Sequence, residues 1–339
     1  MRAAVAFAPR DIRLGQVPLP ELGPHEVRLN VRAVGICGSD IHLFRGEHPY
    51  QVFPMIYGHE FVATVGAVDE AVEGLAPGTP VVVEPLLACG RCYPCRIGRY
   101  NCCANLRVIG VHRNGGLAEH VIVPAERVFP VPNDLPAEVA TLCEPFSIGL
   151  QAVARGEIGG ADRVAILGAG PIGLAVLLIA RSRGARVAVI DLLDSRLALA
   201  RQLGADVTIN GARVDAAAAI TEWTDGEGAS VVVEATGSAR AVESTADLVA
   251  SAGRIVLVGV TTKPVTFPGL DFTRKELTIV GSRNSASQFS NAVRFVSEHR
   301  ATVAAMITHR FPFDQVVRAF QTADTQPEDV CKAVVMIAD

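Results

Sequence analysis

Six short apolar runs in the second half of this sequence constrain its fold more than any other feature. They cover residues 164–167, 186–190, 207–209, 231–234, 255–258 and 277–280. Segments of helix length separate them. The segment 171–183 ends before Gly184, and the segment 194–203 opens with an aspartate suited to capping and ends before Gly204. Strands that alternate with helices in this way predict an α/β fold with a doubly wound parallel sheet.

A glycine-rich turn follows the first of these strands and opens the first helix. It reads Gly168-Ala169-Gly170-Pro171-Ile172-Gly173. Glycines let the backbone turn tightly and approach a pyrophosphate, and the start of a helix offers unpaired amides and a partial positive charge. The pattern therefore predicts a dinucleotide site, and a structural turn without a ligand is the alternative.

An acidic residue at the end of the next strand bears on the choice of dinucleotide. Asp191 lies 18 residues after Gly173, where a carboxylate can bind the adenosine ribose hydroxyls. A 2′-phosphate would face this carboxylate, so the sequence favours NAD over NADP, although Arg196 could reach a phosphate. The predicted cofactor-binding residues are Gly168, Gly170, Pro171, Ile172, Gly173, Asp191 and Arg196.

The first part of the chain differs in composition and in its pattern of apolar residues. Residues 1 to about 140 are rich in glycine and proline, and residues 27–33 alternate apolar and polar side chains, which is typical of strands. After about residue 283 the pattern becomes irregular again and ends in a predicted helix at 314–321 and a strand at 333–337. We expect this tail to return to the first domain. With 339 residues, the chain is long enough for two domains, which we place at 1–148 with 284–339 and at 149–283.

Charge and hydropathy exclude several classes of partner. The net charge is −4, which provides no basic surface for nucleic acid or anionic membranes. The longest uncharged stretch, 164–180, has 17 residues, just below the about 18 that a membrane span needs. The N-terminus lacks a signal-peptide core, so we expect a cytoplasmic protein. In a reducing compartment its eight cysteines are expected to be metal ligands or buried thiols.

Four cysteines share one short loop with the spacing C-x2-C-x2-C-x7-C. They are Cys89, Cys92, Cys95 and Cys103. Four thiolates this close can surround a tetrahedral Zn²⁺ and leave no open position, which predicts a structural site. An iron–sulfur cluster is the chemical alternative. Cys102 is interpreted as a spare thiol.

A second set of metal-ligand residue types is dispersed along the chain. Cys37 lies in GICGSDIH, His59 in GHE and Glu144 in CEPF. From spacing alone, a metal site and separate core or turn residues are equally acceptable interpretations.

The order of the motifs points to a known family. GICGSDIH, GHE, CGRCYPCRIGRYNCC, EPFSIG and GAGPIG follow one another as in the zinc-dependent medium-chain alcohol/polyol dehydrogenases, which the sequence resembles over essentially its whole length. Within that family it resembles the threonine, sorbitol and sugar-acid dehydrogenase branch. The segments VIGVHRNGGLAEH, GSRNS and ITHRFPF look most like bacterial sugar-acid enzymes such as L-galactonate 5-dehydrogenase.

The resemblance implies a GroES-like, β-rich catalytic domain built from both chain ends, a Rossmann domain between them, and an active site in the cleft. Cys37 and His59 would be catalytic zinc ligands, with Glu60 and Glu144 at or next to the metal. Cys143 falls one place before the family's ligand position and is assigned to the core. The resemblance also implies a homo-dimer or homo-tetramer.

The resemblance further implies a mechanism. Zn²⁺ would act as a Lewis acid on a secondary alcohol, hydride would pass to NAD, and a proton relay would run through Ser39 and the cofactor ribose to His42. Hydroxyl and imidazole groups suit that role because both can accept and donate a proton. The alternatives are that Ser39 is the N-cap of a helical turn at 39–44 and that His42 is a turn residue.

Two further residues are candidates for substrate binding. Arg283 follows the last strand of the Rossmann domain and could bind a carboxylate, and His112 could line the cleft. A salt-bridging arginine and a loop histidine are the alternatives. We therefore predict NAD-dependent oxidation of a polyol or an L-galactonate-like sugar acid. L-threonine or another amino alcohol is the second substrate class, and a zinc-ribbon binding module without catalysis is the alternative from another class.

Overall fold

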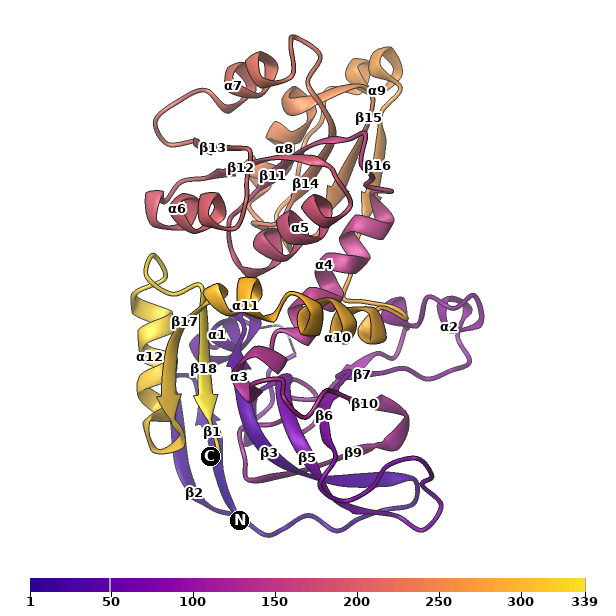
Figure 1. The fold of residues 1–339 in the computed structure, drawn as a ribbon, viewed down its shortest axis with the longest axis vertical. Helices are drawn as coiled ribbons and strands as arrows, with labels where there is room; N and C mark the ends of the chain where they lie inside the picture. Colours follow the sequence, from indigo (N-terminus) through magenta and orange to yellow (C-terminus); the bar gives the residue numbers. More distant parts are fainter. Residues whose placement is uncertain (49, 339) are drawn as a thin grey trace. The chain divides into compact units, whose positions relative to one another are not determined.

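The computed structural model describes residues 1–48 and 50–338, and it divides into two compact units (Figure 1). Unit 1 comprises Met1–Glu144 and Phe289–Asp339, and unit 2 comprises Pro145–Gln288. The divisions expected at 148/149 and 283/284 lie within five residues of these boundaries. No helix among the described residues has the length and apolar character needed to cross a membrane.

Unit 2 is built on a six-stranded parallel sheet with the strand order β13-β12-β11-β14-β15-β16. The strands are β11 (Arg163–Leu167), β12 (Arg186–Asp191), β13 (Val207–Asn210), β14 (Ala229–Glu234), β15 (Val249–Leu257) and β16 (Thr278–Gly281). Five begin within two residues of the predicted runs, and β15 begins six residues earlier than expected. The strand order reverses between β11 and β14, and the carboxyl ends of strands at such a point are where doubly wound folds bind ligands.

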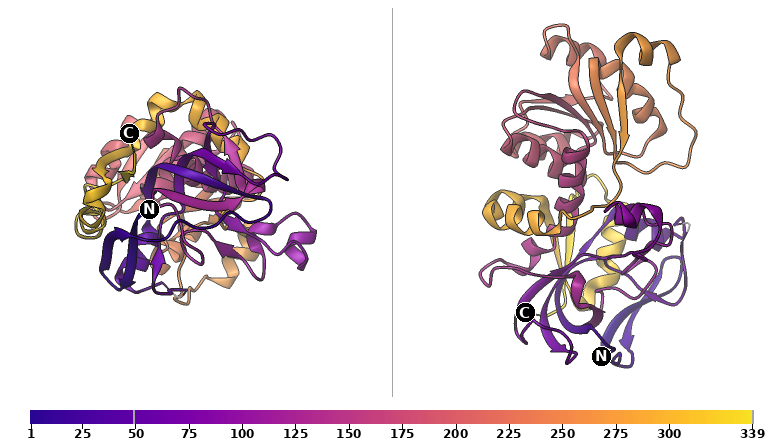
Figure 2. Two further views of the ribbon diagram at one scale, coloured as in Figure 1. Left: turned by 90° about the horizontal axis from the view of Figure 1, so that it is seen from below. Right: turned by 90° about the vertical axis from the view of Figure 1, so that its right-hand side faces the viewer.

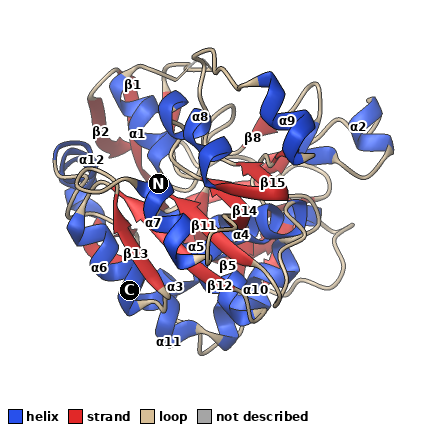
Figure 3. Ribbon diagram, turned by 90° about the horizontal axis from the view of Figure 1, so that it is seen from above, coloured by secondary structure: helices blue, strands red, loops and turns tan. Residues whose placement is uncertain are grey.

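Helices accompany these strands (Figure 3). They are α4 (Cys143–Arg155), α5 (Pro171–Ser182), α6 (Asp194–Gln202), α7 (Ala216–Trp223), α8 (Ala239–Leu248) and α9 (Gly269–Lys275). The capping role expected of Asp194 is wrong. The N-cap of α6 is Leu193, and the Asp194 carboxylate accepts hydrogen bonds from Asn210 at 2.7 Å and Arg213 at 2.5 Å.

Unit 1 is built mainly from strands. Its largest sheet has the order β10-β6-β5-β3-β18-β17, with β9 also paired to β3. The strands are β3 (Glu26–Ile36), β5 (Glu60–Val68), β6 (Pro80–Val83), β9 (His120–Pro124), β10 (Val128–Pro130), β17 (Ile307–Pro312) and β18 (Lys332–Met336). The alternation predicted over 27–33 is confirmed, because the apolar side chains of that stretch, Val27, Leu29, Val31 and Ala33, are at most 1% exposed. Smaller sheets join β1 (Arg2–Ala8), β2 (Asp11–Gln16) and β4 (Met55–Ile56), and β7 (Leu86–Leu87) with β8 (Arg107–Val108).

The C-terminal segment returns to unit 1, as expected, and both termini belong to that unit (Figure 2). This segment contains α10 (Phe289–Glu298), α11 (Arg300–Val303) and α12 (Val316–Thr325). The other helices of unit 1 come from its first segment and are α1 (Gly38–Arg45), α2 (Tyr93–Arg96) and α3 (Ala137–Ala140). The helix expected at 314–321 begins as a 3-10 turn and continues as α12 to Thr325. Strand β18 runs antiparallel to β3, as does β5, so the end of β3 and the starts of β5 and β18 meet at one edge of the sheet.

Candidate active site

Three of the dispersed metal-ligand candidates come together at that edge of the sheet. Cys37 follows β3 and His59 precedes β5, whose first residue is Glu60. One donor atom from each of the three lies within 4.8 Å of the others. A thiol, an imidazole and a carboxylate in this arrangement fit a Zn²⁺ ion that keeps one position open, which is the pattern of catalytic zinc sites.

A buried lysine holds the carboxylate of this cluster. Lys332, the first residue of β18, places Nζ 2.7 Å and 2.5 Å from the two oxygens of Glu60. Both side chains are 1% exposed. Burial by itself lowers the pKa of Lys332, but the charge and hydrogen bonds of Glu60, together with contributions from Cys37 and Glu144, outweigh burial and raise that pKa above its ordinary value. Gly35 makes room for the carboxylate, since a Cβ there would lie 2.3 Å from Glu60 Oε2.

A second acidic residue orients the histidine. Asp40 is 1% exposed, its Oδ2 accepts a hydrogen bond from the Cys37 amide at 2.9 Å, and its Oδ1 lies 3.3 Å from His59 Nδ1. Burial lowers the pKa of His59, but the charge and hydrogen bond of Asp40, together with contributions from Cys37, outweigh burial and raise that pKa well above its ordinary value. With Nδ1 directed at Asp40, Nε2 is the nitrogen left to bind a metal, and it lies 3.4 Å from Ser39 Oγ.

The position of Ser39 corrects one alternative interpretation. The N-cap of α1 is Cys37, and Asp40 supplies the side chain that accepts from the N-cap amide. Ser39 is therefore not the N-cap of this helix. Its hydroxyl instead faces the His59 imidazole.

Glu144 and its neighbour lie in the first turn of α4. Glu144 is 8% exposed, and burial raises its pKa to about 7, although the positive charge of His59 opposes the shift. Among the described residues, Glu144 is outside the three-residue donor cluster. Cys143 is fully buried, in agreement with its assignment to the core, and burial raises the pKa of its thiol.

The cysteine loop brings its four thiols together. One sulfur from each of Cys89, Cys92, Cys95 and Cys103 lies within 4.8 Å of the others, and Cys92 Sγ is 3.4 Å from Cys95 and 3.8 Å from Cys103. Four ligands at about 2.3 Å from a tetrahedral ion are about 3.8 Å apart, so the spacing fits a single Zn²⁺. A cluster that places its own iron and sulfide atoms between the thiols needs more space. Cys102, in the 3-10 turn Tyr100–Cys102, is not part of this group.

Backbone amides and burial shift the pKa values of these thiols. The amides of Arg91 and Cys92 lower the pKa of Cys89 to about 6, whereas burial raises the pKa of Cys95 to about 12. The amides of Cys89 and Asn105 each donate to Cys103 Sγ at 3.3 Å. Amides directed at sulfur are the usual support of thiolate ligands, so the loop is organised for a metal before one binds.

The glycines of the turn in unit 2 have separate roles. Gly168 has φ +98°, and a Cβ at Gly173 would lie 1.8 Å from the Gly168 carbonyl oxygen. Gly170 is the N-cap of α5 and has open space where a Cβ would be. Two glycines thus permit the tight turn and its packing on the helix, and the third leaves the backbone accessible to a pyrophosphate.

Asp191 connects this turn to the end of β12. Its Oδ2 accepts from the Ala169 amide at 2.7 Å, and its Oδ1 accepts from the Leu192 and Leu193 amides at 2.7 Å and 3.0 Å. The Arg196 guanidinium lies 3.9 Å from Asp191 Oδ2. The carboxylate therefore fixes the turn.

The remaining predicted residues lie apart from these clusters. His42 is 58% exposed on α1, with Nδ1 3.1 Å from Glu47 Oε2. His112 Nδ1 accepts from the Val108 amide at 3.1 Å, and its ring centroid is 5.0 Å from that of Tyr50. Arg283 is exposed and belongs to unit 2.

Three residues of unit 1 were not predicted: Asp40, Glu47 and Lys332. Asp40 is close in sequence to the candidate ligand Cys37, and Glu47 is close to the candidate relay residue His42, so proximity alone could have raised them as candidates. Lys332 is 272 residues from Glu60, and nothing in its local sequence separates it from a surface lysine. Only the pairing of β18 with β3 brings it to the site.

Comparison with known proteins identifies the family. Residues 23–133 match the alcohol dehydrogenase GroES-like domain, and residues 171–298 match the zinc-binding dehydrogenase domain. The L-galactonate-5-dehydrogenase of Escherichia coli (strain K12) is 32% identical over 337 residues, which is 99% of this chain and 98% of that protein. The chain belongs to the zinc-binding alcohol dehydrogenase family. As a member of a dehydrogenase family, it is an oxidoreductase, and we set aside the interpretation as a non-catalytic zinc ribbon.

Other dehydrogenases show a comparable similarity to this chain. An L-threonine 3-dehydrogenase of Anaeromyxobacter sp. (strain Fw109-5) is 36% identical and covers 89% of this chain, which in turn covers 90% of that protein. The RspB structure from Escherichia coli CFT073, complexed with the cofactor NADH, superposes with a TM-score of 0.94 at 32% identity and 99% coverage of both chains. A zinc-binding dehydrogenase from Sinorhizobium meliloti bound to NADP has a TM-score of 0.93, also at 32% identity and 99% coverage of both chains. These structures share the GroES-like and Rossmann architecture described above.

Proposed function

We propose that this dehydrogenase oxidises a secondary alcohol of a polyol or an L-galactonate-like sugar acid and transfers the hydride to NAD. The observation that carries the proposal is the cluster of Cys37, His59 and Glu60, whose donor atoms lie within 4.8 Å of one another. A dinucleotide-type turn in the same chain, with Gly168 and Gly173 as its essential glycines, supports it. The L-galactonate-5-dehydrogenase relative supports the substrate class.

The chain's own residues have distinct roles in this proposal. Zn²⁺ would supply Lewis-acid polarisation of the alcohol, and NAD would accept the hydride. Cys37 and His59 would bind the catalytic metal, with Glu60 and Glu144 as the carboxylates at or beside it. Asp40 keeps the His59 imidazole in position through Nδ1. Cys89, Cys92, Cys95 and Cys103 would hold a second, structural Zn²⁺.

Ser39 and His42 would move the proton that the alcohol releases. The Ser39 hydroxyl can accept one proton while it donates another, and the exposed His42 imidazole can pass a proton to water. Replacing His42 by Ala should lower turnover several-fold and change the pH profile of turnover. Wild-type kinetics in that variant would remove the relay.

Asp191 supports NAD as the dinucleotide. Its carboxylate stands at the end of β12, where a 2′-phosphate would be repelled. Arg196, 3.9 Å from that carboxylate, offsets part of the repulsion, and one relative was crystallised with NADP. Rates with NAD and NADP at equal concentration test the assignment directly.

Arg283 and His112 are proposed to contact the substrate. A guanidinium suits a carboxylate or a pair of sugar hydroxyls. If Arg283→Ala leaves the Michaelis constant for a sugar acid unchanged, the carboxylate role fails. Oxidation of L-threonine is the second candidate, because an L-threonine 3-dehydrogenase is 36% identical over 309 residues.

The deciding experiment screens the purified zinc-loaded protein with NAD and NADP against hexonates, pentitols, hexitols and L-threonine. NADH absorbance gives the rates, metal analysis gives the zinc content, and light scattering tests the proposed homo-dimer or homo-tetramer. Cys37→Ala and His59→Ala should lose one zinc per chain and the activity together, while Cys102→Ser should keep both. Full activity with all metal retained in the first two variants would refute the assignment.

A further inference from the structure

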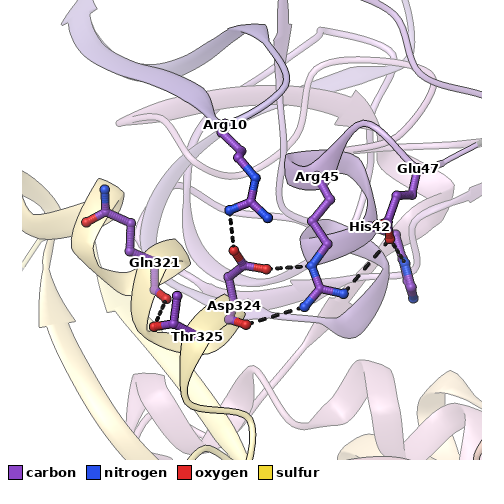
Figure 4. Close-up of polar contacts among 7 residues, drawn as sticks. All are labelled: Arg10, His42, Arg45, Glu47, Gln321, Asp324 and Thr325. Carbon is purple, nitrogen blue, oxygen red and sulfur yellow. Dashed lines mark hydrogen bonds and ion pairs between the residues drawn. The ribbon is translucent and has the colours of Figure 1, made fainter.

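A buried carboxylate outside the metal cluster joins three segments of unit 1 (Figure 4). Asp324 lies on α12 and its side chain is 4% exposed. Its Oδ1 accepts from Arg45 Nε at 2.5 Å, and its Oδ2 accepts from Arg10 Nη1 at 2.5 Å. Arg45 ends α1 and Arg10 belongs to the turn between β1 and β2, so one carboxylate binds guanidinium groups from two other segments.

Helix α1 carries several residues of the candidate active site. Cys37 is its N-cap, and Ser39, Asp40 and His42 lie along it. The helix has only 8 residues, and isolated helices shorter than about 12–15 residues are marginal in water. Its N-terminal end is fixed by β3 and by the contact of Asp40 with His59, whereas its C-terminal end is held through Arg45.

The ion pairs around Asp324 and Arg45 extend to His42 through Glu47. Arg45 Nη1 lies 3.9 Å from Glu47 Oε2, and the same oxygen lies 3.1 Å from His42 Nδ1. Figure 4 shows the contacts running from Arg10 through Asp324, Arg45 and Glu47 to His42. Another titratable group near His42 is His48, whose pKa is lowered mainly by burial and to a smaller extent by His112 and His42. With Nδ1 directed at Glu47, Nε2 is the His42 nitrogen left to receive a proton.

We propose that Asp324 is a positioning residue for the proton relay: it fixes the end of α1 through Arg45, and Arg45 and Glu47 then orient the His42 imidazole. The inference rests on the relay in the proposed function. Asp324 touches neither a metal donor nor the relay itself and acts only through α1. Packing of Phe44 on Phe320, with ring centroids 5.5 Å apart, joins the same two helices and defines their spacing but not the orientation of His42.

The test is a double-mutant cycle on turnover with Asp324→Asn and His42→Ala in the zinc-loaded enzyme. Asp324→Asn should lower kcat several-fold with the KM for NAD unchanged, and it should have no further effect in the His42→Ala background. A purely structural role would give independent losses that multiply. Arg45→Gln, which breaks the same contact from the other side, should reproduce this pattern if Asp324→Asn folds poorly.

Amide hydrogen exchange supplies a readout that does not depend on catalysis. Without cofactor or substrate, exchange in residues 38–46 should be about tenfold faster in Asp324→Asn than in the wild type. Asp162→Asn is the matched control, because Asp162 in unit 2 is 12% exposed and accepts from Arg254 at 2.5 Å. It should change neither exchange in 38–46 nor the coupling to His42.

Each result decides one part of the inference. Multiplying losses in the double variant, or unchanged exchange in 38–46, would overturn the positioning role of Asp324. Wild-type turnover in His42→Ala would refute the relay itself. In that case, the rate of amide hydrogen exchange in residues 38–46 alone would decide whether Asp324 fixes α1: faster exchange in Asp324→Asn would support this role, and unchanged exchange would refute it.

Discussion

Removing the buried cation beside the candidate metal cluster should have a large effect on stability. In zinc-free Lys332→Met the Glu60 carboxylate keeps its place between β3 and β5 but loses its only ion-pair partner among the described residues. Both side chains are 1% exposed, so water cannot screen the lost interaction. Breaking a buried ion pair from one side costs about 3–5 kcal/mol, because a buried charge is left uncompensated.

This cost converts into a measurable shift. Unit 1 has 195 residues, 144 from its first segment and 51 from its second. For a domain of that size, 1 kcal/mol lowers the midpoint of thermal unfolding by about 2–4 °C, so Lys332→Met should melt about 6–20 °C below the wild type. The double variant Lys332→Met/Glu60→Gln should recover at least half of this loss, because it removes the uncompensated charge.

Differential scanning calorimetry of the zinc-free proteins measures the shift, because a Zn²⁺ ion beside Glu60 would itself compensate the carboxylate charge. Lys275→Met is the control, since Lys275 Nζ donates only to two backbone carbonyls, at 2.9 Å and 3.1 Å, in the contacts described. It should cost about 1 kcal/mol or little more. The reasoning is refuted if Lys332→Met melts no lower than this control, or if adding Glu60→Gln restores nothing.

Three further predictions concern the other sites. Gly173→Ala should weaken NADH binding at least about tenfold in a fluorescence titration, because its Cβ would lie 1.8 Å from the Gly168 carbonyl oxygen; unchanged affinity would contradict the tight turn. Cys95→Ser should lose one of two zinc ions per chain by metal analysis and unfold at a lower temperature, whereas retention of both would exclude the cysteine loop as a metal site. Burial raises the pKa of Asp324, but the hydrogen bonds and charges of Arg45 and Arg10 together outweigh burial and leave that pKa below its ordinary value. Its stabilisation is therefore complete above the unfolded pKa of about 3.9 and is lost as pH falls through the lowered folded value. In urea unfolding, the gap in free energy between wild type and Asp324→Asn should be constant above about pH 5 and shrink toward about pH 3; a gap that widens in acid would show that Asp324 is not held as a carboxylate.

Features that depend on neighbouring residues were predictable from the sequence. The strands of unit 2 are short runs of apolar side chains buried on both faces, and the glycine turn follows the first of them directly. The four clustered cysteines lie within residues 89–103, so their grouping needs little more than one loop. The C-terminal tail lies in unit 1, where its final apolar run forms strand β18 beside β3. Local sequence led to a wrong prediction at Asp194, whose carboxylate binds Asn210 and Arg213 instead of capping its helix.

The sequence by itself determined the alternation of strands and helices, the glycine-rich turn and the grouping of four cysteines in one loop, because each follows from side chains a few positions apart. Only the tertiary structure decided which charges surround the dispersed donors. Antiparallel pairing of β3 with β5 and β18 brings Cys37, His59, Glu60 and Lys332 to one sheet edge. Packing of α12 brings Asp324 to the end of α1. Contacts across 272 and 279 residues depend on which strands and helices become neighbours, and no local pattern of residues encodes that choice.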